Sequence, residues 1–239
     1  MSVDIKGPKI LWETDFLGFH ITETMRNAWV IMILITLLCF WLSRGLSVRN
    51  PGKKQIIAEK LVTMLYNLVE SVMGKKYLWF TPYIGALFTF SMVGSLSGLV
   101  GARAMTGDLS TTLGWAILAS VMTIANNIRL HGVGGWLKSY IEPLPFILPL
   151  NIVSEFSNPI SMAFRHFGNI ASGIVISALV YGALTGLSNL LLANTFLAGV
   201  PLFQIGIPAV LSLYFDVFAS FLQAYIISML TMVFVSGAE

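Results

Sequence analysis

The stretch "ISMAFRHFGNIASG" (residues 160–173) places Arg165, His166 and Asn169 inside a run that is otherwise apolar. An arginine in the middle of a bilayer costs about 2.5–3.5 kcal/mol on insertion scales. Its guanidinium stays protonated at any attainable pH, so it carries protons poorly but favours the ionised form of a nearby carboxylate. We therefore interpret Arg165 as a functional charge that faces an anionic group.

Further polar side chains share the helical face of Arg165, because residues three, four or seven positions apart lie on one side of a helix. At these offsets are Asn158, Ser161, Asn169 and Ser172. His166 is turned by about 100° from this face, and we interpret it as a packing or hydrogen-bonding residue. The last apolar stretch has a matching set at the same spacing, namely Ser212, Asp216, Ser220 and Gln223.

Two antiparallel helices with one polar stripe each, and with opposite charges at Arg165 and Asp216, favour a hydrated ion path between them. The alternative is that the two residues form a buried ion pair with no part in transport. The same pair could also serve a self-contained ion-coupled transporter or channel. A purified chain that moves ions unaided would distinguish a transporter from a subunit that needs partners.

The composition predicts an all-α, polytopic membrane protein. The 239 residues are 56% hydrophobic and only 10% charged, and several charge-free runs reach the length of about 18 residues that can span a bilayer. We expect about five membrane-embedded helices plus one amphipathic helix. The net charge of +3 does not suggest a nucleic-acid partner, and we expect no cofactor and no metal site.

The whole chain (residues 1–239) reads as a single membrane domain. We expect an external N-terminus (1–27), a first span (28–46), a basic amphipathic cytoplasmic helix (47–76), a helical hairpin (77–128) and two long helices (147–236). Positive charge gathers after the first and third spans, so the positive-inside rule predicts an N-terminus outside and a C-terminus in the cytoplasm.

The last two apolar stretches are too long for upright spans. As one helix, residues 160–192 would measure about 50 Å at about 1.5 Å per residue, against a hydrocarbon core of about 30 Å. Either Gly182, Gly186 and Pro208 interrupt these stretches, or two steeply inclined helices run along a partner. The sequence leaves both interpretations open.

Several motifs resemble subunit a of the bacterial-type F-type ATP synthase. "NPISMAFRHFGN" and "SFLQAYIISMLTMVFVS" are similar to the last two helices of that family. "EPLPFILPLNIVSEFSNP" is similar to the approach to this region, and "GDLSTT" to the motif before the preceding helix. The resemblance extends over most of the chain from about residue 77 onward.

The resemblance implies a stator that clasps a rotating ring of c subunits with two nearly horizontal helices, beside peripheral-stalk b subunits. Two half-channels would carry protons or sodium ions to and from the ring carboxylate. Arg165 matches the essential arginine, which releases the ion and blocks leakage, and Asn169 and Gln223 match two further family positions. The protein would lie in the bacterial plasma membrane and would not be an enzyme on its own, since it has no P-loop.

The sequence departs from the family pattern in both half-channels. Ile174 stands where bacterial relatives often carry a glutamate, and Asp216 where they often carry a histidine. If Arg165 faces Gln223, Ser172 lies opposite Asp216, and we expect Asp216 to line the outward half-channel with Asn169 and Ser172. Asn151 replaces a glutamate of many relatives, and we expect Glu155 to serve the cytoplasmic entrance instead. The channel lining is then completed by Asn158, Ser161 and Ser220.

Overall fold

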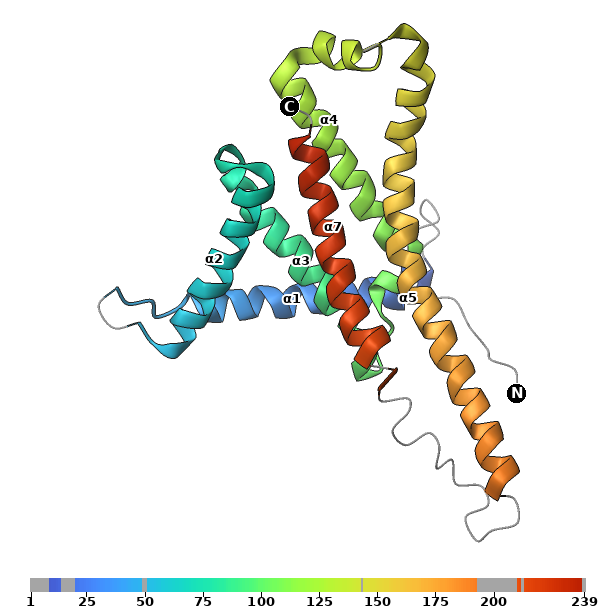
Figure 1. Cartoon of the computed structure of the whole chain (residues 1–239). Helices are drawn as coiled ribbons and strands as arrows, with labels where there is room; N and C mark the ends of the chain where they lie inside the picture. Colours follow the sequence, from blue (N-terminus) through green and yellow to red (C-terminus); the bar gives the residue numbers. More distant parts are fainter. Residues whose placement is uncertain are drawn as a thin grey trace.

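The computed structural model describes residues 9–13, 20–48, 51–142, 144–192, 210–211 and 213–237. Within these ranges the chain is almost wholly helical (Figure 1). Five helical segments are long and apolar enough to cross a membrane: Glu23–Ser43, Lys75–Val100, Leu109–Ser139, Pro145–Leu191 and Asp216–Ser236. The expected all-α, polytopic membrane fold is therefore confirmed.

The N-terminal part holds a feature that the sequence did not predict. Strand β1 (Ile10–Glu13) pairs antiparallel with β2 (His20–Thr22), directly before helix α1 (Glu23–Ser43). The Thr22 hydroxyl accepts a hydrogen bond from the Met25 amide at 3.4 Å and caps the helix. Because this cap lies before the apolar run, α1 begins ahead of the expected start at residue 28.

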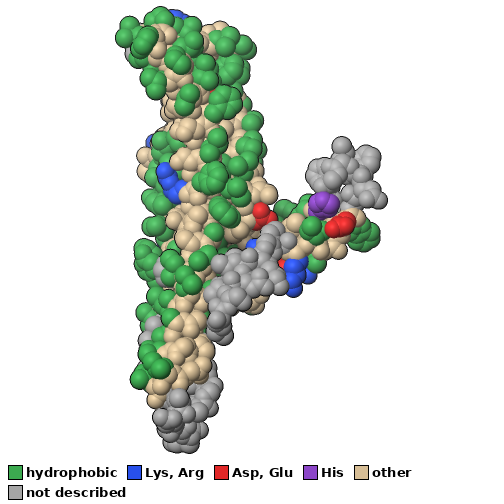
Figure 2. Space-filling model, turned by 90° about the vertical axis from the view of Figure 1, so that its right-hand side faces the viewer, with side chains coloured by type: hydrophobic (Ala, Val, Ile, Leu, Met, Phe, Trp, Pro, Cys, Tyr) green, Lys and Arg blue, Asp and Glu red, His purple; other side chains and the backbone are tan. Residues whose placement is uncertain are grey.

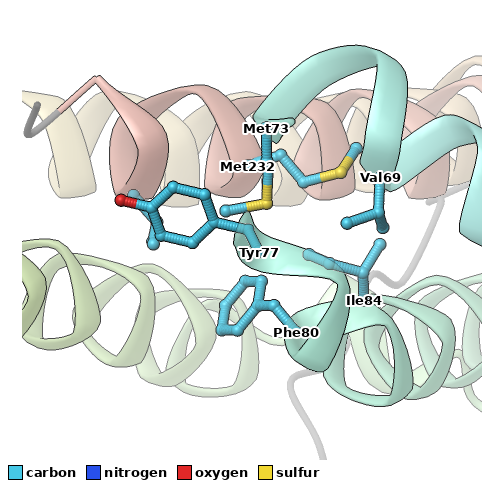
Figure 3. Close-up of a cluster of buried hydrophobic side chains, with 7 residues drawn as sticks. Val69, Met73, Tyr77, Phe80, Ile84 and Met232 are labelled. Carbon is cyan, nitrogen blue, oxygen red and sulfur yellow. The ribbon is translucent and has the colours of Figure 1, made fainter. Parts of the chain in front are cut away.

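Helix α2 (Lys53–Met73) leads through the 3-10 helix η1 (Lys75–Phe80) into α3 (Thr81–Leu96). Figure 3 shows how one side of α2 contributes to a buried apolar cluster. This cluster joins α2, η1, α3 and the end of the last helix through Val69, Met73, Tyr77, Phe80, Ile84, Met232 and Val235. The expected amphipathic helix thus packs its apolar side partly on the bundle.

Two short 3-10 helices, η2 (Ser97–Val100) and η3 (Met105–Gly107), lead to α4 (Leu109–Ser139). Asp108 caps α4 by accepting a hydrogen bond from the Ser110 amide at 3.2 Å. It also accepts one from the Thr24 hydroxyl at 2.9 Å, which ties α1 to the start of α4. The helical segment continues beyond residue 128, with a kink at Gly132, whose φ of 72° suits glycine.

After this kink the chain turns, passes the 3-10 helix η4 (Pro145–Ile147) and runs back as α5 (Leu148–Leu192), as Figure 1 shows. Helix α5 has 45 residues and is continuous through Pro159, Gly182 and Gly186. Such a helix measures about 68 Å, and its C-terminal half extends beyond α3 and α4. For this stretch, the interpretation of an interruption at Gly182 or Gly186 is wrong.

The final stretch is described from residue 210. A π-helix, η6 (Leu213–Phe218), precedes α7 (Ala219–Ser236), which packs among α2, α3, α4 and α5. Pro208 and Ser212, named above, lie outside the described residues.

Small side chains contribute to the core, and the exterior is apolar. A second buried cluster joins α3, α4, α5 and α7 through Leu87, Ala116, Ala119, Met162, Ala163 and Ile227. Figure 2 shows hydrophobic side chains over most of the visible column, with few charged groups. Small residues at helix contacts and apolar side chains outside are typical of membrane bundles.

We predict that Gly94→Val lowers the free energy of unfolding by about 1–3 kcal/mol. A Cβ at Gly94 would overlap the Cε of Met105 and lie 3.0 Å from its Cγ, and Met105 is fully buried. The measurement is thermal unfolding of the detergent-solubilised protein. Gly114→Val is the matched control, because nothing lies within 4 Å of a Cβ at that α4 position. Equal melting temperatures for the two variants would contradict the prediction.

Candidate functional site

Arg165 lies on an outward face of α5, and its side chain is exposed. Within the described part of the chain it forms no ion pair and no hydrogen bond. It therefore makes no ion pair with Asp216, and the structure lends no support to the alternatives that depend on such a pair. An exposed guanidinium on an apolar surface can face an anionic group of another chain.

His166, the next residue, points into the bundle and has no exposed surface. Its Nε2 lies 3.5 Å from the Ser91 hydroxyl of α3, and its ring meets the Trp115 ring of α4 edge-on at 5.6 Å. The interpretation of His166 as a packing and hydrogen-bonding residue agrees with these contacts. Because neighbouring helical residues point about 100° apart, the buried His166 leaves Arg165 facing outward.

Asn169 connects α5 to α7. Its Nδ2 donates a hydrogen bond to Oε1 of the buried Gln223 at 2.7 Å. Gln223 thus pairs with the residue one helical turn beyond Arg165, not with Arg165 itself. In the antiparallel register set by this contact, Ser172 is level with Ser220, and Asp216 is level with about residue 176. The expected juxtaposition of Ser172 and Asp216 is therefore shifted by one turn.

Ser172 is exposed on α5, and its hydroxyl lies 2.6 Å from the Gly168 carbonyl oxygen of the preceding turn. Ile174, one of the positions at which the sequence departs from the family pattern, lies beside η3: a Cβ at Gly107 would be 3.6 Å from its Cδ1. This position of α5 therefore contacts η3 through an apolar side chain.

Asp216 lies in the π-helix η6 and is half-buried, whereas Ser220 and Gln223 are buried in α7. The expected stripe on this helix assumed a period of 3.6 residues. A π-turn is wider, with hydrogen bonds from i to i+5, so it rotates the residues before it relative to those after it. For this reason Asp216 does not share one regular α-helical face with Ser220 and Gln223. Such turns occur frequently at functional sites.

A polar hollow of about 430 Å³ lies between α4 and the first turns of α5. Two of the expected site residues, Glu155 and Asn158, line it, together with Asn151. Its other polar lining comes from Ser120, Thr123, Asn127, Ser139 and Ser154. The sequence analysis did not include the α4 residues. Positions 120, 123 and 127 nevertheless repeat at helical spacing, which is the same signal that indicates the polar face of α5.

The polar hollow and Arg165 lie on one line along α5. Asn158 belongs to the hollow, Ser161 is exposed on the next turn, and Arg165 follows about 10 Å from Asn158. Asp216 lies level with a position beyond Arg165, in the opposite direction. The arrangement thus places a permanent cation between two sets of polar groups, which can separate two ion paths.

The chain matches the family model of the ATP synthase A chain over residues 25–236. It is 33% identical over 237 residues to "ATP synthase subunit a, sodium ion specific" of Propionigenium modestum, covering 92% of this chain and 75% of that protein. It is 33% identical over 216 residues to ATP synthase subunit a of Desulforamulus reducens, covering 90% and 78%. With the Legionella pneumophila subunit a, identity is 29% over 221 residues, covering 92% and 87%.

Both the extent of the family match and the relatives at 33% identity agree with the motifs around Arg165 and Gln223. The chain therefore belongs to the ATP synthase A chain family, as a multi-pass membrane component of the ATP synthase complex.

Proposed function

We propose that this chain is the ion-translocating stator subunit in the membrane sector of a rotary F-type ATP synthase. The observation that carries the proposal is the outward Arg165 of α5, which has no ion-pair or hydrogen-bond partner among the described residues. Its partner in the assembled enzyme is the carboxylate of a rotating ring of c subunits. Peripheral-stalk b subunits hold the chain against this ring, and ATP chemistry belongs to other subunits.

Arg165 acts in two ways in this proposal. A guanidinium close to a ring carboxylate favours the ionised carboxylate, so the bound ion leaves when the ring site arrives. Because the guanidinium does not lose its proton, it also remains a positive charge that opposes direct passage of cations from one half-channel to the other. Release and blocking thus follow from one property of this side chain.

The inner half-channel runs through the polar hollow, with Glu155 and Asn158 leading to Ser161 and Arg165. Its α4 wall supplies Ser120 and Thr123, whose hydroxyls donate to the Ala116 and Ala119 carbonyl oxygens of their own helix. Their oxygen lone pairs are therefore left to face water or a cation. These oxygens suit sodium ions and water chains that conduct protons, and one relative is named sodium ion specific.

The outer half-channel runs on the other side of Arg165, along Asp216, Ser220 and Ser172. The hydrogen bond between Asn169 and Gln223 closes the contact of α5 with α7 between the two paths. The length of α5 supports a steep inclination of this helix along the ring, since 45 residues exceed any upright span.

The C-terminus of the chain faces the cytoplasm of a bacterial plasma membrane in this proposal, with the N-terminus outside. The Asn126 side chain donates to the Val235 carbonyl oxygen at 2.8 Å and to the Tyr77 hydroxyl at 3.0 Å, which places the end of α7 beside η1 and α4. Lys75, Lys76 and Arg129 belong to this same end of the bundle. Positive charge at one end supports a cytoplasmic location of that end.

Arg165→Lys is expected to reduce ATP-driven ion pumping by the reconstituted complex at least tenfold, because lysine keeps the charge but loses the planar fork of donors. Ion uptake and ATP hydrolysis are measured in the same vesicles, with and without sodium, which also identifies the coupling ion. Arg129→Lys is the matched control, since Arg129 lies over the Trp79 ring and outside both half-channels. Normal pumping by Arg165→Lys would refute the role given to Arg165.

Asp216→Asn is expected to slow ion flux several-fold while leaving assembly intact, because it removes the half-buried carboxylate of the outer path but keeps the side-chain shape. Flux is measured in membrane vesicles, and assembly by co-purification of the ring. Glu142→Gln serves as the control, since the ion pair of Glu142 with Lys138 is exposed. An unchanged flux in the Asp216 variant would remove this residue from the path.

A further inference from the structure

The end of α1 and the start of α2 meet at an elbow, which is described in residues 40–48 and 51–60. The sequence from residue 44 to residue 60 holds five lysines and arginines but one acidic residue, Glu59. The net charge of the whole chain is only +3, so the rest of the chain carries no net positive charge. The excess positive charge of this protein is therefore concentrated at the elbow.

Two of these cations lie over exposed aromatic rings in the last turn of α1. The Cζ of Arg44 is 4.2 Å from the centroid of the Phe40 ring, and the Nζ of Lys54 is 4.6 Å from the centroid of the Trp41 ring. Lys54 also donates a hydrogen bond to the Arg44 carbonyl oxygen at 2.8 Å, which ties the start of α2 to the end of α1. Aromatic residues at the end of a membrane span mark the membrane–water interface, so these contacts hold two positive charges at the level of the lipid headgroups.

The chain does not neutralise these charges itself. The described cations of the elbow that form no ion pair with any described carboxylate are Arg44, Lys53, Lys54 and Lys60. The Glu59 carboxylate instead accepts a hydrogen bond from the Gln55 side-chain amide at 2.7 Å. Like charges repel one another more strongly where water is scarce, and an anion from outside the chain relieves this repulsion.

The exposed side of α2 next to the elbow is apolar. Ile57, Leu61 and Met64 lie on one side of the helix, and each is more than half exposed. Lys60 lies about 60° round the helix from Ile57, so a lysine borders this apolar strip. Figure 1 shows α2 turned steeply away from α1, and since α1 is long and apolar enough to cross the membrane, α2 then runs along the membrane surface. An apolar strip bordered by lysines is typical of helices that lie in this interface.

These properties restrict what covers the elbow. A small soluble anion would neutralise the cations but leave the apolar strip uncovered, and a neutral lipid would cover the strip but leave the cations without an anion. We propose that the elbow binds anionic phospholipids, with headgroup phosphates at Arg44 and Lys54 and acyl chains along the apolar strip. Clusters of lysine and arginine at the end of a membrane span attract anionic lipids in this way. The inference goes beyond the proposed function and does not depend on it.

The test uses the assembled ATP synthase in phosphatidylcholine vesicles that contain a small fraction of one of two lipid probes. The probes are phosphatidylglycerol and phosphatidylcholine with the same photoactivatable group on the acyl chain next to the headgroup. Cross-linked peptides are quantified by mass spectrometry. We expect the phosphatidylglycerol probe to label residues 40–64 at least fivefold more strongly than the phosphatidylcholine probe. This preference should fall in 1 M salt, where the Debye length is about 3 Å.

Two competitors distinguish a lipid from a free phosphate. Unlabelled phosphatidylglycerol in the vesicles should suppress labelling by the phosphatidylglycerol probe, whereas soluble glycerol 3-phosphate should leave it unchanged. Equal suppression by glycerol 3-phosphate would show a site for free phosphate esters and overturn the lipid assignment.

Charge variants locate the site on the chain. Arg44→Gln combined with Lys54→Gln is expected to abolish the preference for phosphatidylglycerol, whereas Arg44→Lys combined with Lys54→Arg should retain most of it. The matched control combines Lys75→Gln with Lys138→Gln, which also removes two positive charges, but from lysines that form ion pairs within the chain. This control should keep the full preference. Co-purification of the other subunits verifies that each variant assembles.

Equal labelling by the two probes in the unaltered complex would show a surface that does not select charge, and this result needs no variant to overturn the inference. A preference that survives the loss of both Arg44 and Lys54 would place the site elsewhere, with the same consequence. An elbow that neither probe labels would be covered by another subunit of the complex, and that outcome would replace the lipid with a protein partner.

Discussion

Adjacent residues of a helix point about 100° apart, and this angle links the packing of the bundle to the chemistry of its surface at Arg165 and His166. His166 is held between Ser91 of α3 and Trp115 of α4 and has no exposed surface. This packing sets the rotation of α5 about its own axis. Asn169, bonded to Gln223 on α7, holds the same rotation one turn further on. The outward direction of Arg165 depends on these inward contacts.

Polar contacts between helices add to the two buried apolar clusters in holding the bundle together. The hydroxyl oxygens of Ser95 and Thr106 lie 2.8 Å apart in a buried hydrogen bond. The Asn126 side chain joins α4 to the end of α7 through its hydrogen bond to the Val235 carbonyl oxygen. Where the outer surface is as apolar as the interior, apolar burial alone does not select one arrangement of helices. Directed hydrogen bonds and close contacts at small residues, such as Gly94 against Met105, supply that selection. A bundle stabilised in this way can keep other polar side chains along α5 available for ions.

The kink at Gly132 and the return of the chain into α5 create two neighbouring hollows of opposite character. Residues of α4 that face the hydroxyl and amide groups of α5 form the polar hollow, and the apolar residues around the turn form the other. Glu155 belongs to both walls.

The helical class, the stripe through Arg165 and the family motifs depend on local composition and spacing, and the sequence by itself determined them. The register between α5 and α7 was decided only by the tertiary structure, because it depends on which long side chains meet, here Asn169 and Gln223. The same holds for the π-turn at Asp216, which changes a periodicity that the sequence pattern assumed to be regular. The α4 wall of the polar hollow also required the fold, since the hollow joins segments of α4 and α5 that meet only after the chain turns back between Gly132 and the start of α5.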